Sequence, residues 1–256
     1  MKYPNLEKLV DIIAVLRSEK GCPWDREQTH KSLRPNMLEE AYEAVDAIDD
    51  NDISNLREEL GDVLLQVVLH AQIAKDNNEF DIEDVAKELS DKLIHRHPHV
   101  FGTASVNSAE DVVENWDKLK KEEKLNRKSI LDGISKSQSA LMSAQKISKK
   151  VVKVGFEWDS VESLKECIKS EYKEFEEAVN TGSLDKMEDE MGDIFFATVN
   201  LARWYKIDSE QALLRANKKF IKRFKKMEEL KTKPLEEYSY EEFDKLWKKA
   251  KIEIGE

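Results

Sequence analysis

The sequence predicts an all-α protein built from two similar helical units in tandem. Of its 256 residues, 37% are charged, only eight are Gly and five are Pro. A β-sandwich or barrel would need frequent Gly and Pro turn signals, so this composition favours helices. Apolar residues recur at helical spacing along most of the chain, and the order of the signals repeats in its second half. We therefore expect two copies of one helical unit.

The first unit is expected to span residues 1–125 and to open with two helices. Apolar residues from Leu6 to Leu16 are spaced for an amphipathic helix that stops at Gly21. The sequence GCPWD then predicts a turn, because Pro23 cannot continue a helix. A second helical pattern runs from Pro35 to Asp49.

Three more helices and a linker complete the first half of the chain. Ser54 is the expected N-cap of a helix whose apolar stripe runs from Leu56 to Ala71. Further helices are expected over Ile82–His95 and around Trp116–Lys124. Residues 126–139 are polar and have no apolar period, which predicts a linker.

The second unit is expected to span residues 140–256 and to repeat the signals of the first. The sequence GFEWD answers GCPWD. An acidic helix over Glu171–Val179 ends near Gly182, a natural C-cap residue, and Ser183 can cap the next helix. The apolar stripe from Met187 to Ala202 matches its partner in the first unit.

Each unit carries four acids in the same pattern, arranged as two pairs whose members are three positions apart. The first set is Glu40, Glu43, Glu59 and Asp62, and the second set is Glu171, Glu174, Glu190 and Asp193. Each acid of the first set has its counterpart 131 positions later. Residues three apart on a helix share a face, so two such helices folded back on each other bring four carboxylates together. These repel unless a cation binds among them, which predicts a site for Mg²⁺ in each unit.

The acid pairs and the histidines also admit other interpretations. A single acid pair usually forms a solvated helix face, but such a face does not require four acids in register in both halves. A di-iron site would use Glu-x-x-His, but neither half has a His three residues after any of the four acids of its set. Three alternating histidines, His95, His97 and His99, lack a zinc-site spacing, so a helix end turning into a loop is favoured.

Basic and aromatic residues of the second half suit a polyphosphate beside the acids. Lys219 and Arg223 are four apart on one helical pattern, and an Arg fork with a Lys point charge binds phosphates well. Trp247 and Lys251 share a helical face, where the indole can stack on a base or pack in the core. Asn200, two turns after the last acid of the second set, adds a polar group on the same face.

The bulk composition argues against several other classes of protein. A net charge of −11 disfavours nucleic-acid binding. No apolar run approaches the length of a membrane span, and no signal-peptide core is present. Cys22 and Cys167 show no metal or disulfide spacing, which suits a reducing compartment. We expect a cytoplasmic protein that binds neither nucleic acid nor membranes.

The sequence resembles the MazG family of nucleoside triphosphate pyrophosphohydrolases, in its two-domain form, over nearly its whole length. The motifs that carry the resemblance are GCPWD, EEAYE, EELGD and RHPHVFG in the first half, and GFEWD, EYKE, DEMGD and NKKFIKRF in the second. The resemblance implies tandem all-α MazG-like domains, homodimerisation, Mg²⁺ or Mn²⁺ as cofactor, and hydrolysis of a nucleoside triphosphate to the monophosphate and pyrophosphate. It also implies a role in clearing the nucleotide pool or controlling stress nucleotides.

The resemblance further assigns roles to single residues. It makes both acid sets metal ligands and Glu171, Glu174, Glu190 and Asp193 the catalytic set. It makes Lys169, Lys219, Arg223, Trp247 and Lys251 nucleotide contacts. Ser170 departs from the motif, which has Glu there. The denser cationic helix favours the second half as the more active one. Two alternatives stay open: a non-catalytic helical interaction protein with solvated acidic faces, and a substrate that is an alarmone or a damaged nucleotide.

Overall fold

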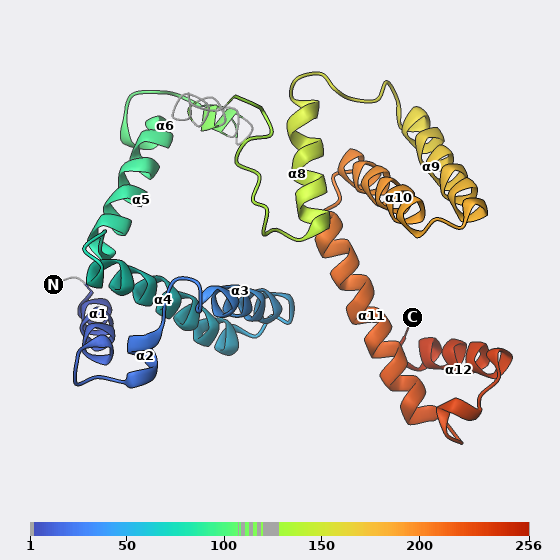
Figure 1. Ribbon diagram of the computed structural model, residues 1–256, viewed down its shortest axis with the longest axis horizontal. Helices are drawn as coiled ribbons and strands as arrows, with labels where there is room; N and C mark the ends of the chain where they lie inside the picture. The colour runs from blue at the N-terminus through green and yellow to red at the C-terminus, as the bar shows by residue number, and fades with distance from the viewer. Residues whose placement is uncertain are drawn as a thin grey trace. The chain divides into compact units, whose positions relative to one another are not determined.

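The fold is taken from a computed structural model that describes residues 3–106, 108, 111–112, 115–116, 119 and 128–255. Within these ranges the regular elements are all helices, so the predicted all-α class is confirmed (Figure 1). The chain divides into two compact units, Met1–Leu125 and Asn126–Glu256. None of the described helices has the length and apolar character needed to cross a membrane.

The first unit contains six described helices. They are α1 (Pro4–Arg17), α2 (Pro23–Glu27), α3 (Arg34–Asp49), α4 (Ile53–Asp76), α5 (Ile82–Arg96) and α6 (Pro98–Phe101). Helices α3 and α4 pack along each other as a hairpin, and α1 and α5 contact α4. The core lies between α1 and α4, where Ile13, Leu33 and Val68 are almost fully buried. Most of the predicted helix around Trp116–Lys124 lies outside the described residues.

Two local predictions for this unit are wrong. The GCPWD sequence is more than a turn, because Pro23 opens the short helix α2. Pro is favoured at a first helical position, where its missing N–H is not needed. The N-cap of α4 is Asp52 rather than Ser54, since the Asp52 carboxylate accepts from the backbone N–H groups of Ser54 and Asn55. A carboxylate one position before the helix reaches both free donors.

Arg17, whose side chain is only 8% exposed, ties α1, α2 and α4 of unit 1 together. Arg17, at the end of α1, donates to the backbone carbonyls of Asp25 and Gln28 in and after α2. Its Nε lies 2.7 Å from the Asp76 carboxylate at the end of α4. The GCPWD segment is thus fixed against the ends of α1 and α4, beside the α3–α4 hairpin.

The second unit contains five α-helices and one short 3₁₀ helix among its described residues. They are α8 (Ala140–Val152), α9 (Val161–Thr181), α10 (Leu184–Trp204), α11 (Ser209–Leu230), η1 (Leu235–Glu237) and α12 (Tyr240–Glu253). Residues 128–139, which belong to the predicted linker, contain no helix. Helix α9 begins about three turns before the predicted Glu171, at a capping box on Ser160. The predicted caps between α9 and α10 are confirmed: Gly182 is left-handed (φ 69°) and Ser183 caps α10.

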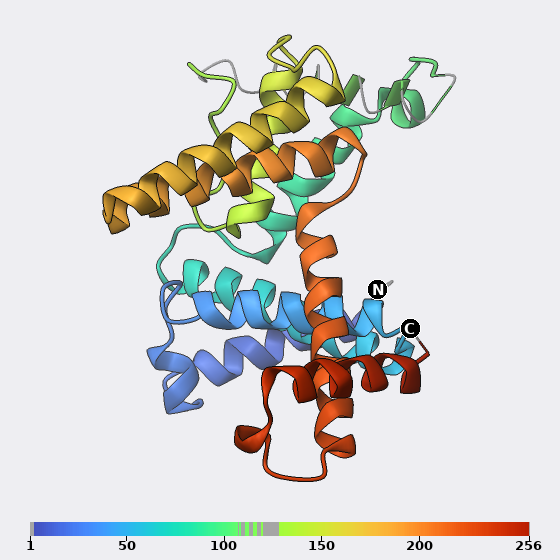
Figure 2. The ribbon, with the colours of Figure 1, turned by 90° about the vertical axis from the view of Figure 1, so that its right-hand side faces the viewer.

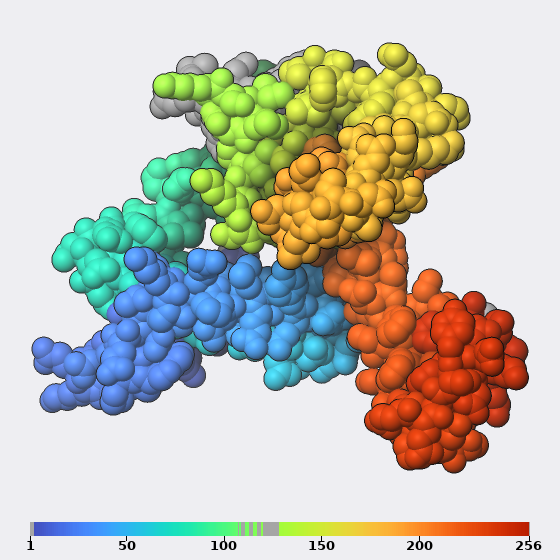
Figure 3. Space-filling model, turned by 45° about the vertical axis from the view of Figure 1, so that its right-hand side comes forward, coloured from blue at the N-terminus to red at the C-terminus, as the bar shows by residue number. Residues whose placement is uncertain are grey.

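Unit 2 is organised as two helix pairs. Helices α9 and α10 lie along each other, and α8 packs on α10 (Figure 2). Helix α12 packs on the C-terminal half of α11, and the space-filling view shows this pair as a lobe of its own within the unit (Figures 1 and 3). The second pair has its own small core, in which Met227, Leu246 and Ala250 are buried.

Candidate functional site

Three acids of the first predicted set converge on the α3–α4 hairpin of unit 1. Glu40 and Glu43 lie one turn apart on α3, and Glu59 faces them from α4. One carboxylate oxygen from each lies within 4.8 Å of the other two. Glu40 and Glu59 are half-buried and Glu43 is exposed, so the cluster opens toward solvent on one side.

The second set forms the same arrangement on the α9–α10 hairpin of unit 2. Glu171 and Glu174 on α9 and Glu190 on α10 also place carboxylate oxygens within 4.8 Å of one another. The burial pattern is identical, with the middle acid exposed and the other two half-buried. The 131-residue repeat of the sequence is therefore a repeat in space.

The fourth acid of each set lies at the edge of its cluster. Asp62 and Asp193 are not among the three acids that converge. Their charges nevertheless act on the clusters, because Asp62 raises the pKa of Glu40 and Asp193 raises the pKa of Glu190. Each fourth acid is therefore electrostatically coupled to its cluster.

The electrostatics of both clusters favour a bound cation. Desolvation, followed by repulsion from Glu174 and other neighbouring acids, raises the pKa of Glu190. Desolvation, followed by repulsion from Glu43 and its neighbours, does the same to Glu59. Both shifts record ionised carboxylates that oppose one another. Carboxylate oxygens are the ligands that Mg²⁺ and Mn²⁺ prefer, so the donor set fits these ions.

The predicted nucleotide contacts on α11 and α12 do not join this cluster within unit 2. Lys219 and Arg223 lie on α11, while Trp247 and Lys251 lie on α12, in the separate helix pair (Figure 1). The charges that shift the pKa of Glu190 most are all acidic. Among the described residues of unit 2, Lys219, Arg223, Trp247 and Lys251 thus belong to a different helix pair from the acid cluster.

These basic and aromatic residues form a cluster of their own. The guanidinium of Arg223 lies over the Trp247 ring, 5.5 Å from its centroid, and the Phe220 ring lies 5.2 Å away. Unit 1 contains the matching pair, with Arg96 over Trp116 at the same 5.5 Å. Each unit thus builds an Arg–Trp contact, with the indole half-buried and one face covered by a cation.

Two further residues of the predicted site, Lys169 and Asn200, bind neighbouring residues of unit 2 instead. Lys169 is exposed and forms an ion pair of 2.7 Å with Glu166 on its own helix. Asn200 is only 1% exposed. Its Oδ1 accepts from the Ser148 hydroxyl at 2.5 Å, and its Nδ2 donates to the Phe196 carbonyl. In this conformation Asn200 joins α10 to α8.

The histidines of the RHPHVFG motif form no metal cluster with acids or cysteines in the part of the chain that is described. His97 bonds through Nδ1 to the Leu93 carbonyl at 2.7 Å. Its ring meets Trp116 edge-on at 4.9 Å. The motif ends α5, as the sequence pattern favoured, but the chain continues into the short helix α6 rather than into the expected loop.

Three side chains near the sites were not singled out from the sequence. Gln66 forms a hydrogen bond with Glu40, and Cys167 donates to Glu171 with an Sγ–Oε1 distance of 3.5 Å. Arg203, on α10, bonds Glu157 of the GFEWD segment at 2.6 Å. The sequence feature that indicates a role for Gln66 is its position one turn after Asp62, on the same face of α4.

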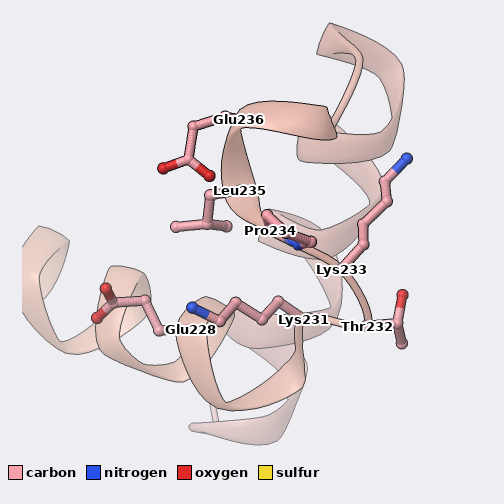
Figure 4. A pocket seen from close by; sticks show the side chains of 7 residues that line it. All are labelled: Glu228, Lys231, Thr232, Lys233, Pro234, Leu235 and Glu236. Carbon is pink, nitrogen blue, oxygen red and sulfur yellow. The ribbon is translucent and has the colours of Figure 1, made fainter.

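A pocket of about 570 Å³ lies outside both acid clusters. It is lined by Glu228 of α11 and by residues 231–236 of the following loop (Figure 4). The Lys231 side chain extends toward Glu228, whereas Lys233 points away and binds Glu242. The lining has balanced charges and none of the predicted site residues, so we assign it no role in catalysis.

Comparison with known proteins follows the same division of the chain. The family profile of the MazG nucleotide pyrophosphohydrolase domain matches residues 28–101 and 159–227, which include both acid clusters. A crystal structure of a mazG-related protein from Thermotoga maritima aligns with 45% of this chain and 98% of that chain, at 32% identity and a TM-score of 0.39.

Two curated relatives are similar over most of their length. The nucleoside triphosphate pyrophosphohydrolase/pyrophosphatase MazG of Thermotoga maritima is 47% identical over 249 residues, which is 96% of this chain and 95% of that protein. The nucleoside triphosphate pyrophosphohydrolase of Escherichia coli K12 is 43% identical over 231 residues, or 88% of each protein. With two family domains and relatives matched nearly end to end, this chain belongs to the MazG family of nucleotide pyrophosphohydrolases.

Proposed function

We propose that this protein is a Mg²⁺-dependent nucleoside triphosphate pyrophosphohydrolase. It converts an NTP or dNTP and water to the monophosphate and pyrophosphate, and so clears unwanted nucleotides or controls stress nucleotides. The observation that carries the proposal is the pair of carboxylate clusters, built alike on two helix hairpins. Family membership supports the reaction type.

The residues divide the chemistry between them. Glu171, Glu174, Glu190 and Asp193 would hold the cation, which would supply neutralisation of the polyphosphate charge and acidification of the attacking water. Water attacks the α-phosphorus, the bond to the bridging oxygen breaks, and pyrophosphate leaves with that oxygen. One carboxylate of the cluster accepts the water's proton. Lys219 and Arg223 stabilise the charge on the departing pyrophosphate.

The protein is proposed to work as a homodimer. Large apolar side chains are exposed on the helices of unit 2, such as Phe195 at 59% and Phe220 at 57%. Exposed apolar groups of this size are typical of association surfaces. A second chain is also a natural source of the cations that the α9–α10 cluster does not receive within its own unit.

Separate substitutions decide which unit is active. We expect Glu190→Gln to abolish pyrophosphate release and Glu59→Gln to reduce it less, because the second unit has the denser cationic helix. Loss with Glu59→Gln alone reverses the assignment. Product analysis over NTPs, dNTPs, alarmones and damaged nucleotides, scored as monophosphate plus pyrophosphate or diphosphate plus phosphate, defines the substrate class.

The non-catalytic alternative makes a different prediction for metal binding. A site that binds Mg²⁺ only in the folded state raises the melting temperature as the Mg²⁺ concentration rises. An interaction protein with solvated acidic faces shows no such dependence beyond that of ionic strength. A matched titration with NaCl separates the two effects.

Inorganic pyrophosphatase activity is a second candidate function. One relative carries both activities in its name, and the two clusters of this chain have different neighbours, Gln66 in unit 1 and Cys167 in unit 2. One unit can therefore release pyrophosphate while the other hydrolyses it. Phosphate release from added pyrophosphate, assayed in the two Glu→Gln variants, tests this division.

A further inference from the structure

Gln66 is a buried amide at the edge of the unit 1 cluster. It lies on α4, one turn after Asp62, and is 4% exposed. Desolvation raises the pKa of Glu40, and the Gln66 side chain, within reach of that carboxylate, lowers it by hydrogen bonding. Because a carboxylate accepts, the donor is the Nε2 group of Gln66. The amide thus holds one of the three converging acids from across the hairpin.

The other end of the same amide has no partner. The Oε1 atom of Gln66 is fully buried and accepts no hydrogen bond from any residue that the structure describes. An unpaired buried acceptor costs about 1–3 kcal/mol relative to a satisfied one. An apolar side chain of similar size would avoid this penalty. A buried acceptor that lacks a donor, at the edge of the acid cluster, is therefore better explained by a donor that arrives with a bound ligand.

Unit 2 is built differently at the same point. The position that corresponds to Gln66 is Ala197, which is buried at 4% exposure and has no polar side chain. The counterpart of Glu40 is Glu171, and it accepts instead from the Cys167 thiol on its own helix. A thiol is a weak donor, so unit 2 holds this carboxylate less firmly.

We propose that Gln66 is a positioning residue of the unit 1 metal site, with no equivalent in unit 2. Its Nε2 fixes the orientation of Glu40, and its Oε1 accepts a hydrogen bond from a water that enters with the cation. This inference rests on the proposed metal site of unit 1. It goes beyond the proposed function by giving the two clusters different metal affinities, with unit 1 the tighter of the two for Mg²⁺.

The test uses the full-length chain with the unit 2 cluster disabled by Glu190→Gln, so that unit 1 binding is measured alone. In this parent, Gln66→Met replaces the amide by an apolar side chain of similar length. Gln72→Met is the matched control, because Gln72 is also on α4 and its amide also donates to a carboxylate, Asp76, at 2.7 Å. Asp76 is not part of the cluster.

The Mg²⁺ affinity and the melting temperature in EDTA are expected to respond differently to Gln66→Met. Mg²⁺ affinity from calorimetric titration falls about 10-fold or more in Gln66→Met, the usual effect of losing an outer-shell partner of a metal ligand. The melting temperature in EDTA stays equal to that of the parent or rises, because the unpaired buried oxygen is gone. Gln72→Met leaves the Mg²⁺ affinity unchanged.

Three results overturn the inference. Unchanged Mg²⁺ affinity in Gln66→Met shows that the amide does not position the site. A lower melting temperature in EDTA, with a matching loss of affinity, shows a structural role only. If the parent itself binds no Mg²⁺, the proposed metal site of unit 1 fails and the inference fails with it, an outcome that is distinct from the first two.

Discussion

At the scale of single residues, both acid clusters are built from carboxylate side chains. Glu59 and Glu190 are held near other acids without a compensating positive charge from the described residues of their clusters. The folded metal-free protein therefore contains repulsion that is released either by protonation or by a cation. This connects metal binding to stability through the same few side chains.

The sign of the pH dependence follows from the raised pKa values. A carboxyl with a folded pKa above its unfolded value stabilises the fold below the unfolded pKa, about 4.3 for Glu. That contribution is lost as the pH rises through the folded pKa. In EDTA, we expect the stability due to Glu59 and Glu190 to decline above this point. The double variant Glu59→Gln, Glu190→Gln should show a flatter decline in urea unfolding between acidic and neutral pH.

The control for this prediction is Glu188→Gln, which removes an exposed acid from the same helix as Glu190. It should leave the slope of the parent nearly intact. Saturating Mg²⁺ should reverse the decline in the parent and have no such effect in the double variant. An equal pH slope in parent and double variant, both in EDTA, would contradict the electrostatic account of the clusters.

At this scale the acids were predictable and their supporting residues were not. The helical period placed Glu40, Glu43 and Glu59 on facing surfaces, and they do converge. Gln66 does not follow from the repeat of the two halves, because its counterpart in unit 2 is Ala197. Whether a polar side chain such as Asn200 faces a site or a neighbouring helix depends on tertiary contacts that a period does not encode.

At the scale of the helices, local chemistry determines most of where each helix lies and where it ends. Apolar periodicity located α3, α4, α9 and α10, the four helices that carry the acids, and Gly182 and Ser183 marked the turn between the last two. The errors lie at helix starts. A capping residue acts through one or two hydrogen bonds, and several neighbouring Asp and Ser residues can supply them.

The corrected cap of α4 gives a direct test. Asp52→Ala removes the carboxylate that accepts from the N–H groups of Ser54 and Asn55. We expect a loss of about 1 kcal/mol in the unfolding free energy of unit 1, the usual effect of deleting an N-cap. Ser54→Ala should change it by only a few tenths, since its hydroxyl is not the cap. Urea unfolding followed by circular dichroism measures both, and a larger effect from Ser54→Ala would restore the cap inferred from the sequence.

At the scale of the whole molecule, the sequence leaves undetermined which distant helices meet one another. The repeat of 131 positions predicted two like clusters, and two like clusters are present. Periodicity describes which residues share a helix face but not which distant helix meets that face. The acids of α9 and α10 and the cations of α11 and α12 are predicted to serve one site, yet they occupy different helix pairs of unit 2. Their association therefore has to be tested between chains.

Mixed dimers give that test. Two inactive chains, one with Glu190→Gln and one with Arg223→Met, both in a Glu59→Gln background, are mixed by co-expression. If the carboxylates of one chain work with the cations of its partner, each mixed dimer regains one intact site and one doubly damaged site. Random pairing in a symmetric dimer then restores about a quarter of the background activity. If each chain supplies its whole site, the mixture stays as inactive as its components. Each variant expressed alone is the control, and its measured mass in solution establishes that it still forms the dimer.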